Sequence, residues 1–234
     1  MMSGNTPRSD RLLPAVHDLA LRLGADPAGK SFGVYLEQSG QMRRLGGKRW
    51  INFSAKQTIS ASHFDFDWNA RMGPFGMISV RDAFVDGDGQ LAVRALGFIP
   101  IVRADPSAAL TRGELMRYLA ELAWAPDAIL HNTGLRWRED GPDILTVGAG
   151  QNDTAAEVTL NLDSQGKIAG VFAPDRPRSV TAPFLPTPWR GRFSDYRNHG
   201  GRWIPFAGEV AWEIDGKSQT YFQCKIERWA MPAD

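Results

Sequence analysis

The sequence predicts an α+β fold: a strongly curved antiparallel β-sheet, an incomplete barrel, with two helices covering its concave face. Segments in which apolar and polar side chains alternate, as along half-buried strands, occupy most of the chain. Turn sequences such as D-G-D-G at residues 86–89 and D-S-Q-G at 163–166 join some of these segments, which favours antiparallel neighbours. Roughly a dozen strands in one open sheet must curl or split, and only two segments of useful length have a helical period.

The clearest helix is predicted at residues 111–124, T-R-G-E-L-M-R-Y-L-A-E-L-A-W. Thr111 can cap its first turn while Glu114 bonds back to the Thr111 amide, as in a capping box. Three leucines share its apolar face: Leu115, Leu119 and Leu122. Pro126 ends this helix, because proline clashes with the preceding turn and has no amide hydrogen. A second helix is predicted at residues 14–23.

Strands are predicted on both sides of the central helix. Those before it are expected at residues 33–39, 41–45, 49–58, 62–71, 77–85 and 90–102. Those after it are expected at residues 135–138, 144–147, 157–162, 168–173, 203–206, 209–214 and 219–229, following one more helical turn at 126–130. The proline-rich segment 176–192 is expected to be a long loop.

Composition narrows the function classes. The 234 residues carry a formal net charge of +1, which provides no field for nucleic acid or an anionic membrane surface. The single Cys224 excludes an intrachain disulfide and a thiolate metal cluster. Eight tryptophans suit a deep core or a wide apolar cleft. Residues 1–10 are expected to be a disordered tip, and residues 11–234 a single domain.

The chain is expected to be cytoplasmic. Its N-terminus has no apolar segment of the kind that a signal peptide needs. No run of about 18 apolar residues, the length of a spanning helix, occurs in the sequence. The sequence does not fix the oligomeric state.

Several motifs, taken in order, carry a family resemblance. They are W-x-x-F-x-A-x-Q at 50–57, F-x-W-x-A-R at 66–71, R-D-A-F-V-D-G-D-G at 81–89, R-G-E-L-M-R-Y-L-A-E-L-A-W-A-P at 112–126, P-W-R-G-x-F-x-D-Y at 188–196 and G-R-W-I-P-x-x-G-E-V-A-W at 201–212. Together they resemble a family of functionally uncharacterised bacterial proteins, over about residues 12–229. More distantly, the strand pattern is similar to lipoprotein carriers and receptors of the bacterial envelope. That resemblance implies an incomplete barrel whose mouth holds acyl chains under helices, although this sequence lacks their signal peptide.

One candidate site is a polar stripe on the central helix, opposite the leucines. It consists of Glu114, Arg117 and Glu121, with Tyr118 at its border and Trp124 at its end. The stripe is either a solvated face with intrahelical ion pairs or the lining of a cleft between helix and sheet.

A second candidate site is P-W-R-G-R-F-S-D-Y-R at residues 188–197. Its arginines could clamp an anionic head group, since guanidinium groups form paired hydrogen bonds with phosphate or carboxylate. Alternatively, the segment is a structural corner held by cation–π contacts and an ion pair of Asp195.

Scattered histidines, the lone cysteine and the lack of glycine-rich phosphate loops give little support to metal, nucleophilic or nucleotide chemistry, so no metal or cofactor is expected. The leading hypothesis is non-catalytic binding of a hydrophobic or amphipathic small molecule, such as an acyl chain or lipid, between the sheet and the helices. The alternatives are an enzyme with Glu121 or Asp195 as general base, and a protein-interaction module with an exposed tryptophan patch. The candidate ligand-binding residues are Trp68, Arg81, Arg117, Tyr118, Glu121, Trp124, Trp189, Arg192, Asp195 and Tyr196.

Overall fold

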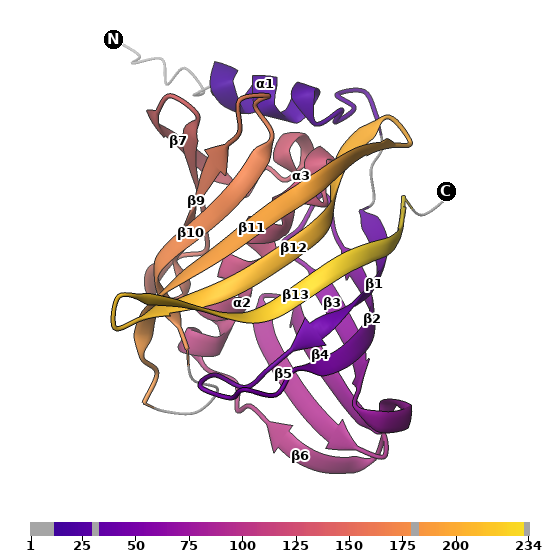
Figure 1. Ribbon diagram of the computed structural model, residues 1–234. Helices are drawn as coiled ribbons and strands as arrows, with labels where there is room; N and C mark the ends of the chain where they lie inside the picture. Colours follow the sequence, from indigo (N-terminus) through magenta and orange to yellow (C-terminus); the bar gives the residue numbers. More distant parts are fainter. Residues whose placement is uncertain (1–11, 30–32, 179–182, 232–234) are drawn as a thin grey trace.

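Thirteen antiparallel strands form one strongly curved, open sheet in the computed structural model of the chain (Figure 1). The structure describes residues 12–29, 33–178 and 183–231, so the predicted disordered tip at 1–10 lies outside it. The strand order is β6-β5-β4-β3-β2-β1-β13-β12-β11-β10-β9-β8-β7. The predicted incomplete barrel is confirmed.

The first half of the sheet is built from the strands before the central helix. They are β1 (Val34–Met42), β2 (Ile51–Ile59), β3 (Phe66–Met72), β4 (Ile78–Val85), β5 (Asp88–Ala95) and β6 (Ile99–Arg103). The second half contains β7 (Arg136–Gly141), β8 (Ile144–Ala149), β9 (Ala156–Leu162), β10 (Ile168–Pro177), β11 (Pro186–His199), β12 (Arg202–Ile214) and β13 (Lys217–Ala230). Strands β1 and β13 join the two halves in the middle of the sheet.

The helices lie within the curve of the sheet and across one of its ends (Figure 1). Inside the curve are α2 (Ala108–Ala120), η2 (Glu121–Ala123) and α3 (Pro126–His131), while α1 (Pro14–Arg22) lies across one end and packs on α3. Two short 3-10 helices, η1 (Pro74–Gly76) and η3 (Asn152–Thr154), lie between strands. The leucine face of α2 is buried, as predicted from its spacing.

The start of α2 was predicted three residues too late. The helix begins at Ala108, and its N-cap is Ser107, whose hydroxyl accepts a hydrogen bond from the Leu110 amide. Thr111 lies inside the helix, where its hydroxyl accepts from the Gly89 amide at 3.2 Å and fixes α2 to the start of β5. The predicted capping box is therefore wrong, and Glu114 is free to point into the protein.

Four strand predictions are wrong, mainly because glycine and proline do not end or exclude strands where the sequence suggests. Residues 203–206 and 209–214 belong to the single strand β12. Gly40 does not turn the chain but lies within β1, where a Cβ would come within 2.1 Å of the Gln223 carbonyl of β13. The predicted strand 90–102 is two strands, since Leu96 and Gly97 adopt positive φ and turn the chain between β5 and β6. The segment 176–192, expected to be a loop, includes the first part of β11. The first proline of β11, Pro186, is tolerated there because the pairing of β11 with β12 begins only at Trp189.

Candidate functional site

A cavity of about 350 Å³ lies between α2 and the concave face of the sheet. One wall is the face of α2 that contains Gly113, Glu114, Arg117 and Glu121, residues three and four apart on the helix. The opposite walls come from strands on both sides of the β1–β13 pair. The polar stripe of the central helix therefore lines a cleft, and the solvated alternative is wrong.

Seven aromatic side chains contribute to the apolar wall. They are Trp68, Trp124, Trp189, Phe193, Trp212, Tyr221 and Phe222. The indole nitrogens of three of them are satisfied within the protein, where Trp68 donates to Gln38, Trp124 to the Pro205 carbonyl and Trp189 to the Tyr221 hydroxyl. Their hydrogen-bonding edges are thereby fixed, and their apolar ring surface faces the cavity.

A chain of buried hydrogen bonds crosses the helix side of this cavity. Arg117 donates through Nε to Glu121 Oε1 at 2.8 Å and through Nη1 to Asp82 Oδ2 on β4. The second oxygen of Glu121 accepts from Gln57 Nε2, and Gln57 accepts in turn from Gln38. This network ties α2 to three strands of the first half of the sheet and leaves Glu121 with both oxygens occupied.

Arg117 is held as a cation at the centre of this network. Burial alone would lower the pKa of its guanidinium, but the carboxylates of Glu121 and Asp82 raise that pKa by more than burial lowers it. The guanidinium also lies 4.8 Å from the ring centre of Phe66 and 5.3 Å from that of Trp68. The charge is thus compensated by two acids and two aromatic faces.

The carboxyl group of Glu114 is favoured in its neutral form, in contrast to the charged guanidinium of Arg117. Burial raises the pKa of its carboxyl well above the usual range, and the nearby negative charge of Asp82 raises it further. The guanidinium of Arg176 on β10 offsets this only in part, because its Nη2 lies 3.9 Å from Glu114 Oε1. Arg176 also donates through Nε to the Gly113 carbonyl at 3.2 Å and stacks 4.5 Å from the Trp189 ring centre. Glu114 is therefore a carboxylic acid that stays protonated well above its ordinary pKa.

Two carboxyl oxygens at this wall receive no hydrogen bond from an N–H or hydroxyl group of the described residues. They are Asp82 Oδ1 and Glu114 Oε2, and both are buried. Both residues line the cavity. A hydrogen bond between the carboxyl groups of Glu114 and Asp82 also raises the pKa of Glu114, so a protonated Glu114 and Asp82 form a buried acid pair. Because no other protein group bonds to these two oxygens, the acid pair is the place where a polar group of a bound molecule can add a hydrogen bond.

The sequence profile of a family of unknown function (DUF6544) matches residues 12–224. The chain belongs to this family. The membership expected from the motifs is thereby confirmed. No curated protein sequence matches the DUF6544 chain.

Solved structures share the fold of the DUF6544 chain at low sequence identity. A DUF1329 family protein from Desulfovibrio piger is 14% identical, with a TM-score of 0.52 and coverage of 93% of this chain and 92% of its own. A LolA superfamily protein from Nitrosomonas europaea is 9% identical, with a TM-score of 0.52 and coverage of 93% and 94%. A putative outer membrane lipoprotein-sorting protein domain from Vibrio parahaemolyticus is 10% identical, with a TM-score of 0.53 and coverage of 93% and 90%. The predicted likeness to lipoprotein carriers is confirmed as a likeness of fold.

Half of the ten predicted site residues lie at the cavity of the DUF6544 chain. They are Trp68, Arg117, Glu121, Trp124 and Trp189. Tyr118 is fully buried behind the cavity, where its hydroxyl donates to the Ser60 carbonyl and accepts from Asn132. Arg81 does not line the cavity, because it is on the outer face of β4, where it pairs with Asp67 at 2.8 Å.

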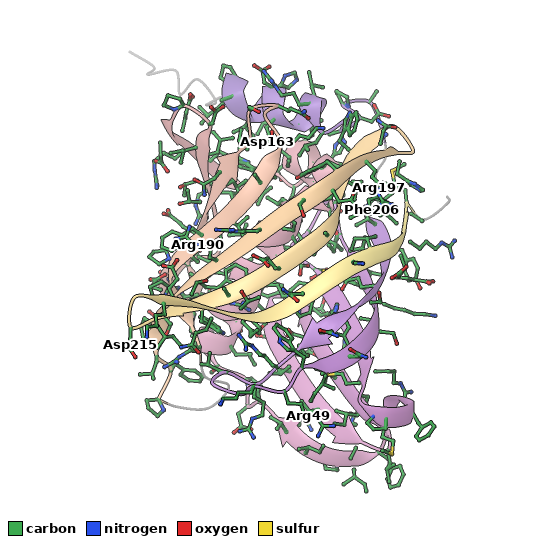
Figure 2. The ribbon with its side chains drawn as sticks, in the orientation of Figure 1. Arg49, Asp163, Arg190, Arg197, Phe206 and Asp215 are labelled. Atoms are coloured by element: carbon green, nitrogen blue, oxygen red, sulfur yellow. The ribbon has the colours of Figure 1, made fainter. Side chains whose placement is uncertain are left out.

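The second predicted cluster, residues 188–197, is divided between the two faces of β11. Alternation along β11 directs Trp189 and Phe193 inward and leaves Arg192 exposed on the other face. Asp195 is exposed and pairs with Arg197, whose guanidinium stacks 4.6 Å from the Phe206 ring centre (Figure 2). Tyr196 is half-buried and donates to the Ile168 carbonyl. This geometry is that of the structural corner, and Asp195 does not line the cavity beneath α2.

Sequence reasoning missed three cavity residues that matter here: Asp82, Arg176 and Trp212. Asp82 lies two residues after Val80 on β4, and Trp212 lies two residues after Val210 on β12, so strand alternation directs each pair to the same face. All four residues line the cavity. Arg176 was hidden in the segment expected to be a loop.

The tryptophan patch of the interaction-module alternative does not form. All eight tryptophans lie in the described residues, where five are buried and the others half-buried. Within the same residues, no helix is both long and apolar enough for a membrane span. Nor does the described part of the chain group three or more histidine, cysteine or acidic side chains as a metal site requires.

Proposed function

We propose that the DUF6544 chain binds an amphipathic small molecule in the cavity beneath α2, without covalent chemistry. The apolar body of the ligand packs against the aromatic wall, which includes Trp124, Trp189 and Trp212. Its polar end meets the helix wall at Asp82, Glu114 and Arg176. The observation that carries the proposal is this combination of an aromatic cavity with a buried acid pair, Asp82 and Glu114, at its helix wall.

The acid pair also limits the polar end of the ligand. Asp82 Oδ1 accepts a hydrogen bond, whereas a protonated Glu114 can donate one. A group that both donates and accepts, such as a hydroxyl, satisfies both. The cavity volume of about 350 Å³ lies at the lower end of the range for small-molecule sites, about 300–1,000 Å³. One acyl chain with a small uncharged head is the class of ligand that fits.

Gly113 provides the test, because it lines the cavity and its Cβ position is open. A Cβ there would meet the Pro177 carbonyl oxygen at 3.9 Å and Arg176 Nε at 4.0 Å, which are ordinary contacts. Gly113→Leu would fill the cavity, whereas Gly113→Ala is the matched control that leaves most of its volume. Calorimetric titration of the delipidated protein with monolauroylglycerol and with laurate would compare an uncharged and an acidic head on the same chain.

We expect monolauroylglycerol to bind the Gly113→Ala protein like the parent and the Gly113→Leu protein at least roughly tenfold more weakly. Gentle-ionisation mass spectrometry before and after solvent extraction would show whether the purified protein already contains a removable adduct. If neither amphiphile binds and no adduct appears, the proposal is wrong. If the Gly113→Leu protein binds as tightly as the parent, the ligand binds at a site other than this cavity.

An enzymatic function has one specific observation in its favour, and it concerns Glu114 rather than the predicted Glu121. A buried carboxyl with a raised pKa at a cavity has the properties of a general acid. Turnover of acyl esters that Glu114→Gln abolishes, with ligand binding retained, would support this second candidate. The cytoplasmic location expected from the sequence stays a prediction.

A further inference from the structure

Three chain connections meet at one end of the sheet. The strand register pairs Met42 with Ile51 at the β1–β2 connection, Met72 with Ile78 at β3–β4, and Ala95 with Ile99 at β5–β6. Because β2 pairs with β3 and β4 with β5, these three connections lie side by side at the same end. Figure 1 places β6 at this end and α1 at the opposite one. We call this region the β1–β6 tip, made of residues 43–50, 71–77 and 94–103.

Large apolar side chains protrude from each connection of the β1–β6 tip. Phe75 is 101% exposed and Phe98 is 74% exposed. The other exposed apolar residues of the tip are Leu45, Met77, Leu96, Ile99 and Ile101. Together they make up seven of the twelve large exposed apolar side chains among the described residues. Such a concentration on one region marks a surface that meets another apolar phase.

Backbone conformation gives an independent indication. Phe75 has a φ of 54° and Leu96 a φ of 52°, in the left-handed region that favours glycine and asparagine. Every other non-glycine residue with positive φ in the described chain is an aspartate or asparagine. The two exceptions are both apolar, both exposed and both at the tip. Phe75 gains no burial within the fold and more than half of Leu96 stays exposed, so packing inside the fold does not account for the strained backbone at these two positions.

The charge of the β1–β6 tip differs from that of the whole chain. Its three segments contain Arg43, Arg44, Lys48, Arg49, Arg71, Arg94 and Arg103, and no aspartate or glutamate. The tip therefore carries +7, and since the net charge is +1, the remaining chain carries 1 − 7 = −6. None of the seven cations forms a salt bridge with a described carboxylate. Figure 2 labels Arg49 in the lower part of the molecule, where Figure 1 draws β6.

We propose that the β1–β6 tip docks on the surface of an anionic lipid bilayer. Phe75, Leu96 and Phe98 enter the boundary between head groups and acyl chains, and the surrounding basic residues contact lipid phosphates. Side chains that protrude separately suit a fluid interface, which can close around each of them, better than they suit the flat surface of a folded partner. The cavity also extends toward this end, since Met42, the last residue of β1, lines it. Docking itself does not depend on what the cavity binds.

The test is flotation of the full-length protein with vesicles of pure phosphatidylcholine and of phosphatidylcholine mixed with phosphatidylglycerol. The variant Phe75→Asn/Leu96→Asn removes two apolar side chains while keeping residues that tolerate positive φ. Its matched control is Leu21→Gln, which removes an exposed leucine from α1 at the opposite end. For charge, Arg44→Gln/Arg49→Gln is compared with Arg136→Gln/Arg138→Gln on β7.

We expect binding to the mixed vesicles that weakens as salt increases, with little binding to pure phosphatidylcholine. The tip variants should lower the partition coefficient by roughly tenfold or more, and the two controls by less than about twofold. Absence of binding to the mixed vesicles overturns the proposal, as does binding that the tip and control variants weaken equally. Capture of single-stranded DNA that needs the arginines but not Phe75 would assign the tip to nucleic acid instead. Failure of ligand binding in the cavity leaves these outcomes unchanged.

Discussion

The substitution Arg117→Met would remove the cation at the centre of the buried network and keep a side chain of similar length. It leaves the carboxylates of Asp82 and Glu121 in the interior without their shared partner. Loss of one partner of a buried ion pair destabilises by about 3–5 kcal/mol. In a chain of this length 1 kcal/mol corresponds to about 2–4 °C in melting temperature, so a decrease of roughly 6–20 °C is expected.

The matched control is Arg81→Met on the outer face of β4. The Arg81 side chain is 43% exposed and pairs with Asp67, whereas the Arg117 side chain is 14% exposed. An exposed ion pair contributes about 0–1 kcal/mol, so Arg81→Met should change the melting temperature by no more than about 4 °C. Urea unfolding followed by tryptophan fluorescence, with calorimetry, would measure both variants.

The triple variant Asp82→Asn/Arg117→Met/Glu121→Gln separates charge from packing. It leaves no unpaired buried charge, so it should recover most of the stability that Arg117→Met loses. If Arg117→Met and Arg81→Met lose equally little, the network is hydrated and the description of α2 as an electrostatically fixed wall is refuted. If the triple variant is as unstable as the single one, the loss comes from packing against Phe66 and Trp68.

Three further predictions concern single sites. Glu114 has a raised pKa in the folded state, so its contribution to stability is complete below the ordinary value of 4.5 and is lost as pH rises through the folded pKa. Glu114→Gln should therefore gain stability relative to the parent as pH rises above 4.5, and a constant difference in urea midpoints would contradict this. Gly89→Ala should lower the free energy of unfolding by about 1–3 kcal/mol, because the added Cβ would lie 2.9 Å from the α2 backbone. A Cβ at Gly141 would have nothing within 4 Å, so the control Gly141→Ala should change the free energy of unfolding by less than about 0.5 kcal/mol. Burial raises the pKa of the Cys224 thiol to about 12. Iodoacetamide at about pH 8 should therefore alkylate the native protein at least roughly 100-fold more slowly than the urea-unfolded protein. Equal alkylation rates, measured by mass spectrometry, would show that β13 opens readily.

Local patterns were sufficient for the architecture of the chain. Alternation along residues 62–71 correctly placed Phe66 and Trp68 on the buried face of β3, and the 3.6-residue period of α2 placed its leucines in the core. Glycine and proline misled where tertiary contacts decide their role. At Gly40 the missing side chain makes room for β13, a strand about 180 residues away that no local pattern reveals.

The candidate site was only partly predictable from the sequence, again because tertiary contacts decide the role of its residues. Helical spacing grouped Glu114, Arg117 and Glu121, but their burial depends on both halves of the sheet closing around α2. Charged side chains opposite the leucines give α2 the sequence of an amphipathic surface helix, although both of its faces are buried. Net charge does not show how charge is distributed, because a total of +1 averages a basic tip with an acidic remainder.

The pairing of β1 with β13 has a consequence for how the chain reaches this fold. Of the twelve neighbouring strand pairs, eleven join strands that are consecutive in sequence, and only this one closes a long loop. Each half of the sheet can therefore assemble from local hairpins, and the loop-closure entropy is concentrated in one seam. Tyr35 faces Ala230 across that seam, and a linker from the end of β13 to the start of α1 would leave only about 20 residues and the linker between them. Such a circular permutant, with its new ends at the exposed Asp105 and Pro106 between β6 and α2, separates no paired strands and should fold faster than the natural chain.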